Sequence, residues 1–367
     1  MLLVKIHRDA LLRPLQIVSG IVERRHTLPI LANILIRKDG ENVSLLSTDI
    51  EVQISTHAAI GSGKDVVATT VAARKLLDIL RALPEVEVSL SLTNKRMTVQ
   101  SGKSRFALQT QSAEEFPTVV QAEHFSAKVV LPQKTLKHLF NMVHFSMAQQ
   151  DIRYYLNGLL LVVDGKNVIA VATDGHRLAF SQIVTEQEFV RQEVIIPRKT
   201  ILELQRLLEE TDDPVTLQIA TNQVKLDFSD IELISKLVEG KFPDYTRVIP
   251  KVYKNNFSID RDVLLRSLQR TAIMTSDKFK GVRCVIAPGS LKISSTNADQ
   301  EEAVEELEID YSGDSVDIGF NVTYLLDVLN NLKCDQVSIS LGDANSSALI
   351  TVPDDPNFKY VVMPMRI

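Results

Sequence analysis

The 367-residue chain has two cysteines and no long apolar run, and these absences exclude several classes of protein. Cys284 and Cys334 lack the short spacing of a metal site or a redox-active pair. We therefore expect both to be reduced thiols, as in a cytoplasmic protein. No apolar stretch is long enough to cross a bilayer, and Lys5, His7 and Arg8 interrupt any signal-peptide core. The sequence thus predicts a cytoplasmic protein without a membrane partner.

Motifs that carry catalysis are also absent. The chain has no P-loop, no nucleophile elbow and no zinc-protease helix, and its seven histidines are scattered. In Thr173–Leu178, Asp174 and His176 stand two positions apart and could act as acid and base. A tight Asp-Gly turn between two apolar strands explains the same residues. We expect no enzyme activity, cofactor or metal; the alternative is a hydrolase or transferase that uses Asp174 and His176.

What the sequence does contain is a threefold internal repeat. A Leu-rich helical segment recurs at residues 9–16, 132–139 and 262–269. A second helical segment recurs at residues 73–80, 197–204 and 322–329. A repeat this long is a whole domain and not one turn of a solenoid. The sequence therefore predicts three domains, at residues 1–126, 127–254 and 255–367.

Apolar and polar residues alternate between the predicted helices. This is the pattern of strands with one solvent-exposed face. Examples are residues 42–46, 95–100, 215–219 and 337–341. Each repeat contains two helices separated by several strands, unlike the strict alternation of a parallel sheet. We therefore expect an α+β fold in which two helices pack on antiparallel sheets in each domain.

Charge is distributed unevenly along the chain. The net charge is −5, yet the six helical windows contain 15 Lys and Arg against 7 Asp and Glu. The helices therefore form a basic surface if they share one face, and the remainder of the chain is acidic. Solvated helix surfaces are often basic too, so the count alone leaves both interpretations open.

A second asymmetry separates the first repeat from the third. Residues 95–105 contain four bases and no acid, and residues 299–310 contain seven acids and no base. Opposite charges at opposite ends of a chain favour head-to-tail association, which gives rings when the rotation closes. Two unrelated solvated strand edges would show the same charges.

Four longer motifs carry a resemblance to a known family. They occupy residues 149–158, 172–178, 235–245 and 360–367. Together they resemble the bacterial replicative sliding clamp, the β subunit of the DNA polymerase holoenzyme, and the similarity covers the whole chain. The resemblance implies three tandem clamp domains and a ring-shaped head-to-tail homodimer, with helices lining the hole and sheets outside. Such a ring slides because a basic lining attracts phosphates without reading bases.

The resemblance also assigns residues. Those expected near duplex DNA are Arg25, Arg74, Gln150, Tyr154, Tyr155, Arg198, Lys199, Phe279 and Lys280. Family members commonly have Arg where this chain has Lys280, so the charge is kept and a bidentate phosphate fork is lost. Those expected at the dimer contact are Lys103, Arg105, Phe106, Ile273, Met274, Glu301 and Glu305. Met274 replaces the family's Leu at nearly the same volume.

A peptide-binding pocket is implied as well. It maps to Leu156, Thr173, Gly175, His176, Arg177, Leu178, Pro243, Arg247, Val248, Ser347, Val361, Met363, Pro364, Met365 and Arg366. Leu, Val, Pro and adaptable Met with a few polar groups suit a short peptide that has Leu and Phe anchors. The implied partners are the replicative polymerase, an ATP-dependent clamp loader and other clamp-motif proteins of replication and repair. A triplicated interaction scaffold without a DNA role is the second alternative.

Overall fold

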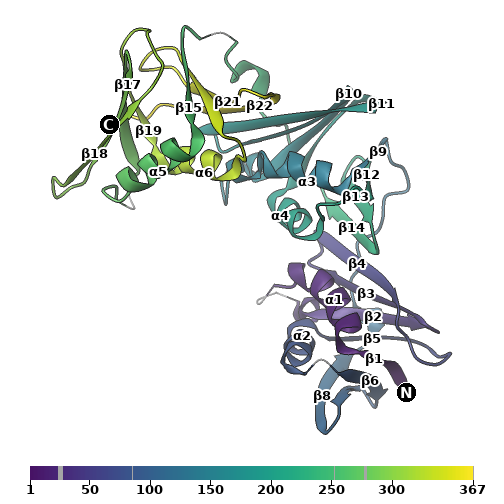
Figure 1. The fold of residues 1–367 in the computed structure, drawn as a ribbon. Helices are drawn as coiled ribbons and strands as arrows, with labels where there is room; N and C mark the ends of the chain where they lie inside the picture. The colour runs from purple at the N-terminus through teal and green to yellow at the C-terminus, as the bar shows by residue number, and fades with distance from the viewer. Residues whose placement is uncertain (24–27, 85, 252, 277–278, 367) are drawn as a thin grey trace. The chain divides into compact units, whose positions relative to one another are not determined.

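The computed structural model describes residues 1–23, 28–84, 86–251, 253–276 and 279–366 (Figure 1). Its α-helices coincide with the repeated segments, as the sequence predicts. They are α1 (Arg8–Val18), α2 (Ala73–Ala82), α3 (Gln133–Asn141), α4 (Arg198–Leu207), α5 (Arg261–Ala272) and α6 (Val322–Asn331). None of these helices is long and apolar enough to cross a membrane.

The helices form because their apolar residues recur on one side. In α2 the buried residues are Ala73, Leu76, Leu77 and Leu80, the spacing of a single helix face. Helix α5 begins at a capped end, since the Asp260 side chain accepts a hydrogen bond from the Val263 amide at 2.9 Å. The apolar faces pack on the sheets and leave the charged residues outside.

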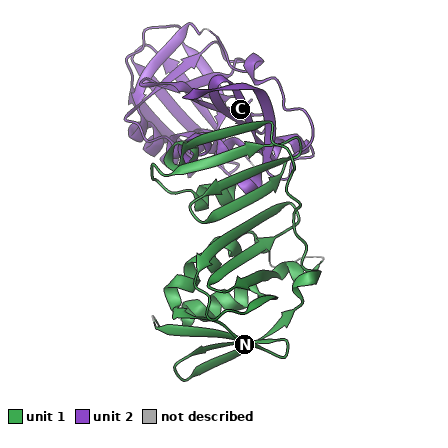
Figure 2. Cartoon of the chain, turned by 90° about the vertical axis from the view of Figure 1, so that its right-hand side faces the viewer, with its two compact units in different colours: residues 1–136, 202–237 green, residues 137–201, 238–367 purple. Residues whose placement is uncertain are grey.

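The chain divides into two compact units (Figure 2). The first contains residues 1–136 and 202–237, and the second contains residues 137–201 and 238–367. The predicted central domain is shared between the two units. These two units do not correspond to the three repeats, and the predicted boundaries at 126 and 254 stay a prediction.

The first unit is built on one antiparallel twelve-stranded sheet. Its order is β1 (Leu2–His7), β6 (Glu87–Thr93), β7 (Arg96–Ser101), β8 (Ser104–Gln111), β5 (Val66–Ala72), β2 (Asn33–Asp39), β3 (Asn42–Thr48), β4 (Val52–Ala59), β14 (Ile231–Lys236), β13 (Gln223–Phe228), β12 (Pro214–Ile219) and β9 (Ala127–Pro132). Helices α1 and α2 contact each other and pack on this sheet.

The second unit contains two antiparallel sheets. The six-stranded sheet has the order β10 (Gly158–Thr173), β11 (Arg177–Pro197), β22 (Asp355–Val362), β21 (Ala348–Val352), β20 (Gln336–Leu341) and β15 (Asn255–Asp260). The four-stranded sheet has the order β18 (Glu302–Glu308), β17 (Ser290–Thr296), β16 (Gly281–Ala287) and β19 (Val316–Asn321). Antiparallel sheets with two helices per repeat confirm the predicted α+β class.

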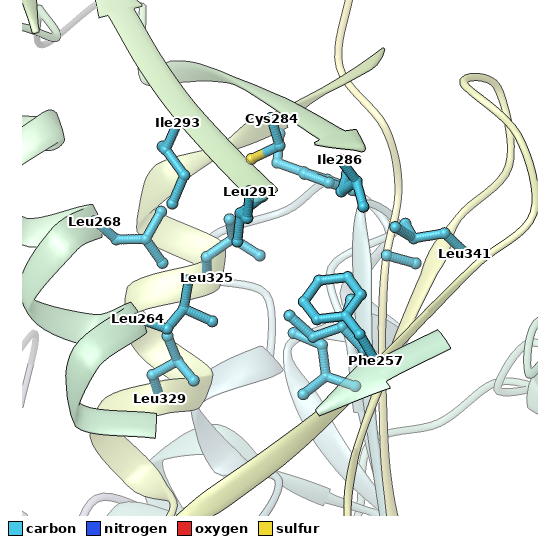
Figure 3. A pocket seen from close by; sticks show the side chains of 14 residues that line it. Phe257, Leu264, Leu268, Cys284, Ile286, Leu291, Ile293, Leu325, Leu329 and Leu341 are labelled. Atoms are coloured by element: carbon cyan, nitrogen blue, oxygen red, sulfur yellow. The ribbon is translucent and has the colours of Figure 1, made fainter. Parts of the chain in front are cut away.

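Helices α5 and α6 enclose the apolar core of the third repeat. Leu264 and Leu268 of α5 and Leu325 of α6 point toward Phe257 and Cys284 around a cavity of about 40 Å³ (Figure 3). Burial raises the pKa of the Cys284 thiol to about 12, so this thiol stays protonated at neutral pH. The cavity is lined by apolar side chains and this inert thiol, and it offers no group for catalysis. Both cysteines are free thiols, as expected.

Candidate functional site

The turn between β10 and β11 is a copy of a turn in the first repeat. The Asp174 carboxylate accepts hydrogen bonds from the amides of His176 and Arg177 at 2.9 and 3.1 Å. The Asp49 carboxylate accepts equivalent bonds from the amides of Glu51 and Val52 at 3.0 and 2.7 Å. The Thr-Asp pair is thus repeated because it closes the same turn.

This hydrogen bonding argues against an acid and base pair. The second oxygen of Asp174 binds the Arg177 guanidinium at 3.1 Å, so the carboxylate holds the turn and its arginine. The His176 ring stacks on Tyr324 with centroids 6.4 Å apart. The Asp174 carboxylate binds the backbone amide of His176 and not its ring. The Asp174 side chain pairs with Arg177, whereas the His176 ring stacks on Tyr324. The turn explanation therefore replaces the catalytic one.

Arg177 is the buried charge of the site. Its side chain is 9% exposed, and its guanidinium binds Asp327 of α6 at 2.5 Å and lies 4.4 Å from the centre of the Tyr324 ring. Burial lowers the pKa of Arg177, but Tyr360, Asp327 and Asp174 outweigh it and the net pKa is raised. The arginine stays charged and ties the turn to α6.

The apolar part of the predicted pocket sits beside this turn. Leu156, Leu178 and Val361 are almost fully buried in one core cluster, and Val248 packs against it. The C-terminal segment is fixed to the turn, because the Met363 amide donates to the His176 carbonyl at 2.8 Å. Leu178 and Val361 are also opposite each other in the pairing of β11 with β22.

The exposed surface of this region is formed by the C-terminal segment. Met363 is 36% exposed, Pro364 and Met365 are half-buried, and Arg366 is exposed. We call Met363, Pro364, Met365 and the His176–Tyr324 stack the tail patch. Methionines on a surface beside a buried apolar cluster are typical of adaptable peptide-binding sites.

The other predicted pocket residues belong to the same unit as this patch. Gly175 has a φ of +88°, and Ile50 has a φ of +80° at the corresponding position of the first turn, so both turns use the same left-handed backbone. Arg247 is exposed and binds Asp244 at 3.0 Å. The Thr173 hydroxyl donates to the Arg177 carbonyl, and Ser347 accepts from the Tyr253 hydroxyl. Pro243 is exposed.

Sequence reasoning missed Tyr324, Asp327 and Arg153. Tyr324 and Asp327 lie on α6, far along the chain from the turn they hold. A usable signal was the repeat itself, since Tyr324 occupies the position at which the second helix of the first repeat has Lys75. An aromatic residue at a helix position that is basic and exposed in another repeat indicates that this side chain packs against another part of the protein.

The predicted DNA residues of the second repeat lie at the start of α4 and in the segment before β10 that contacts it. Arg198 donates to the Met147 carbonyl at 3.2 Å, and burial together with the nearby Arg177 charge lowers its pKa. Tyr154 is 58% exposed and meets Tyr155 edge to face at 5.9 Å. Gln150 is exposed, and Lys199 is half-buried.

The remaining predicted DNA residues are placed elsewhere. Arg74 is exposed on α2 and donates to the Val22 carbonyl at 2.9 Å. Phe279 is 37% exposed, and the Lys280 carbonyl accepts from the Val322 amide. Arg25 lies outside the described residues.

The predicted dimer-contact residues lie on or beside two open strand edges. Residues 104–109 of β8 pair only with β7, and β18 pairs only with β17, among the described strands. Lys103, Arg105 and Glu301 are exposed, and Phe106 is 38% exposed. Ile273 is 73% exposed just after α5.

One ion pair joins α5 to the open edge of β18. The Arg270 guanidinium binds both oxygens of Glu305, at 2.8 and 2.5 Å. Hydrogen bonding to Arg270 holds the pKa of Glu305 below its ordinary value of 4.5. Glu305 is therefore a fixed negative charge on the side of β18 that faces α5. Met274, four residues after Arg270 in the chain, is half-buried.

Two other strand pairings connect successive repeats, and we call them sealed seams. The first joins β4 to β14, with Val52 opposite Ser235. The second joins the start of β11 to β22, with Arg177 opposite Val362. In the first two repeats, the strand after the Thr-Asp turn pairs with the last strand of the next repeat. The corresponding strand after the turn in the third repeat is β18, and the last strand of the first repeat is β8. These two strands have no such partner among the described residues.

Comparison with known proteins agrees with the threefold division. The N-terminal, central and C-terminal domain models of the DNA polymerase III beta subunit match residues 2–120, 130–244 and 246–366. The chain is 44% identical to the "Beta sliding clamp" of Pseudomonas aeruginosa over 366 residues, 99% of each protein. It is 44% identical to that of Escherichia coli K12 over 363 residues, again 99% of each.

Solved structures give the same result. The crystal structure of the DNA polymerase III subunit beta from Pseudomonas aeruginosa matches with a TM-score of 0.95 at 43% identity. The beta subunit from Caulobacter crescentus matches with a TM-score of 0.93 at 37% identity. Both alignments cover 100% of both chains.

Proposed function

The chain belongs to the family of DNA polymerase III beta subunits, the sliding clamps that act as non-catalytic processivity factors, and we propose that two copies close head to tail into a ring. The observation that carries this proposal is the pair of sealed seams. Two of the three inter-repeat pairings are made inside the chain, and the strands of the third, β18 and β8, are open. In a head-to-tail dimer, each of these two edges meets the other copy.

We propose the register of the third seam from that of the first seam, between β4 and β14. Gln53 and Leu178 both stand opposite the threonine that precedes their turn, and Glu302 stands opposite Thr296 in the same way. Ile231 and Ser104 each begin the last strand after its hairpin. Since Gln53 pairs with Ile234, Glu302 is proposed to pair with Ala107 of the other copy.

This register brings complementary groups together. Phe106 faces Ala303, on the same face of β18 as Glu305 and hence beside α5 and Ile273. Arg105 faces Val304 and has Glu302 and Glu306 as diagonal neighbours, within reach of a long side chain. The proposed contact therefore has an apolar side toward the helices and a charged side away from them.

Duplex DNA and a polymerase are the partners that clamp identity implies, and we propose the routes by which this chain meets them. Arg74, Arg198 and Lys199 contact phosphates on the helix side, without reading bases. The tail patch and the cluster around Leu178 bind a short apolar peptide of the polymerase and of other clamp-motif proteins. An ATP-dependent loader places the ring on DNA in the cytoplasm.

Retention on circular DNA tests the proposal. After loading by a clamp loader and ATP, the protein should stay on a nicked circle through gel filtration and leave when a restriction enzyme linearises it. A protein that binds by contacts alone would remain on the linear product. A scaffold with no DNA role would not be retained at all, and either result would overturn the ring.

A further inference from the structure

A second hollow lies against the six-stranded sheet, over β10, β11, β21 and β22. Its volume is about 540 Å³. It is lined by Ile169, Phe180, Leu349, Lys359 and the segment 245–251 without Arg247 and Val248. All of these belong to the second unit. We call this hollow the lysine groove, after Lys251 and Lys359.

The groove has an apolar floor. Phe180 is 7% exposed and tilts against Tyr245 with ring centroids 5.9 Å apart. Ile169, Ile249 and Leu349 are half-buried against the same core cluster that holds Leu178 and Val361. A hollow with an aromatic floor suits an apolar side chain of a ligand better than a sugar-phosphate backbone.

Two lysines give the groove its positive charge. Lys359 places its ammonium 5.4 Å from the centre of the Phe180 ring, and Lys251 is exposed. Neither lysine has a carboxylate partner in the described part of the chain. Burial raises the pKa of Tyr245, and the carboxylates of Glu193, Asp164 and Asp244 act in the same direction. Arg191 binds Asp164 and Glu193 at 2.7 and 3.2 Å, and Arg247 binds Asp244 at 3.0 Å. Their charge is therefore largely committed.

The groove is continuous with the proposed peptide pocket. Phe180 follows Leu178 by two positions on β11, and Lys359 precedes Val361 by two positions on β22, so each pair lies on one face of the sheet. Val248 and Ile249 are neighbours in the chain and pack on the same cluster. A peptide anchored beside Leu178 therefore reaches the groove within a few residues.

We propose that the lysine groove binds the flank of the same partner peptide, an apolar residue accompanied by Asp or Glu. This inference rests on the proposed function, because the pocket beside Leu178 must hold the anchors. The apolar floor takes the apolar side chain, and Lys251 and Lys359 face the carboxylates. The groove thus ranks partners that share the same anchors by the charge of their flanking residues.

Three peptides with identical Leu and Phe anchors test the inference by calorimetric titration. One peptide has no flank, one has a flank of Leu with Asp and Glu, and one has a flank of Leu with Lys. The acidic flank should tighten binding to the native dimer about tenfold over the Lys flank at low salt, and the gain should shrink as salt rises.

The clamp carrying Lys251→Glu and Lys359→Glu should reverse the order of the two flanked peptides and bind the unflanked peptide as the native protein does. Lys64→Glu with Lys333→Glu is the matched control, with the same net charge and the native order of peptides. Thermal unfolding shows that each variant is folded.

The outcomes separate this inference from the proposed function. If the unflanked peptide fails to bind the native dimer, the pocket and the groove are both wrong. If it binds and the flank charge has no effect, only the groove is overturned. If the double variant loses retention on DNA and keeps the native order of peptides, the lysines contact DNA and the inference is wrong.

Discussion

The sealed seams and the open edges of this chain are built from different residues. Across β4 and β14, Ile54 faces Leu233, and both are fully buried. Across β11 and β22, Leu178 faces Val361 in the same way. The open strand β18 instead contains four glutamates in seven residues, and the open part of β8 contains Arg105 next to Phe106.

This difference follows from what each edge must do. A sealed seam is buried when the chain folds, so apolar pairs stabilise it throughout the life of the protein. An open edge is exposed until a second copy arrives, and charges on an edge strand prevent pairing with unrelated strands. In the proposed ring, the opposite charges on β18 and β8 then select each other. A clamp that must open to admit DNA keeps its charged seam between copies.

The largest effect is expected from a charge placed at equivalent positions of the two kinds of seam. Leu233→Asp buries an uncompensated carboxylate opposite Ile54 and should destabilise the fold by about 4 kcal/mol or more. Phe106→Asp changes the corresponding residue of the open edge and should leave a folded monomer. Thermal unfolding and sedimentation measure both. Equal loss of folding stability in the two variants would remove the distinction between the seams.

Removing the apolar side of the open contact should come next. Ile273→Ala with Met274→Ala deletes apolar surface that the second copy is proposed to cover, at a cost of about 1.5 to 3 kcal/mol for each side chain that becomes fully buried. Because a ring has two such contacts, sedimentation at low micromolar concentration should show monomer. Leu202→Ala, exposed on α4, is the control. A persistent dimer would count against these residues.

Removing the end of the sealed β11–β22 region tests whether the seam and the pocket are separate. Deleting residues 363–367 leaves every pair from Arg177–Val362 to Ser181–Phe358 intact, so the dimer should persist. Loss of two Met and one Pro should remove about 3 to 5 kcal/mol from peptide binding, which makes a micromolar peptide undetectable. Calorimetry showing near-native affinity would place the pocket elsewhere.

Substitutions that touch neither kind of seam should change DNA binding only. Arg198→Ala with Lys199→Ala should lower the slope of log affinity against log salt by about one unit for each lost phosphate contact. Sedimentation should show an unchanged dimer. An unchanged salt slope would remove these residues from the DNA face.

The smallest effect concerns acid. Arg270 holds the pKa of Glu305 below 4.5, so the ion pair is present above that value and is lost as pH falls through the lowered pKa. Arg270→Gln should move the acid dissociation of the dimer to higher pH by less than about one unit. Arg283→Gln breaks a similar exposed pair with Asp317 on β16 and β19 and is the control. Equal acid profiles for both variants would show that Glu305 does not support the contact.

The fold could be predicted from the sequence because each repeat carries its own local signals. The paired helices and the Thr-Asp turns recur, and Asp49 and Asp174 make the same hydrogen bonds. The seams could not be predicted in this way, since pairing of β4 with β14 depends on which edges meet in space. Ion pairs between residues far apart in the chain could not be predicted from the sequence either. The sequence predicts Arg177 only as one of the pocket residues, whereas in the fold Tyr324 and Asp327 hold its guanidinium buried.

The most direct test of the third seam is a charge exchange between its two strands. One variant carries Glu302→Lys and Glu306→Lys on β18, and the other carries Lys103→Glu and Arg105→Glu on β8. Each variant alone places like charges at both contacts and should be monomeric in native mass spectrometry. An equimolar mixture has opposite charges at both contacts and should form only the mixed dimer. Stable dimers of either variant alone, or a mixture that remains monomeric, would contradict the pairing of β18 with β8.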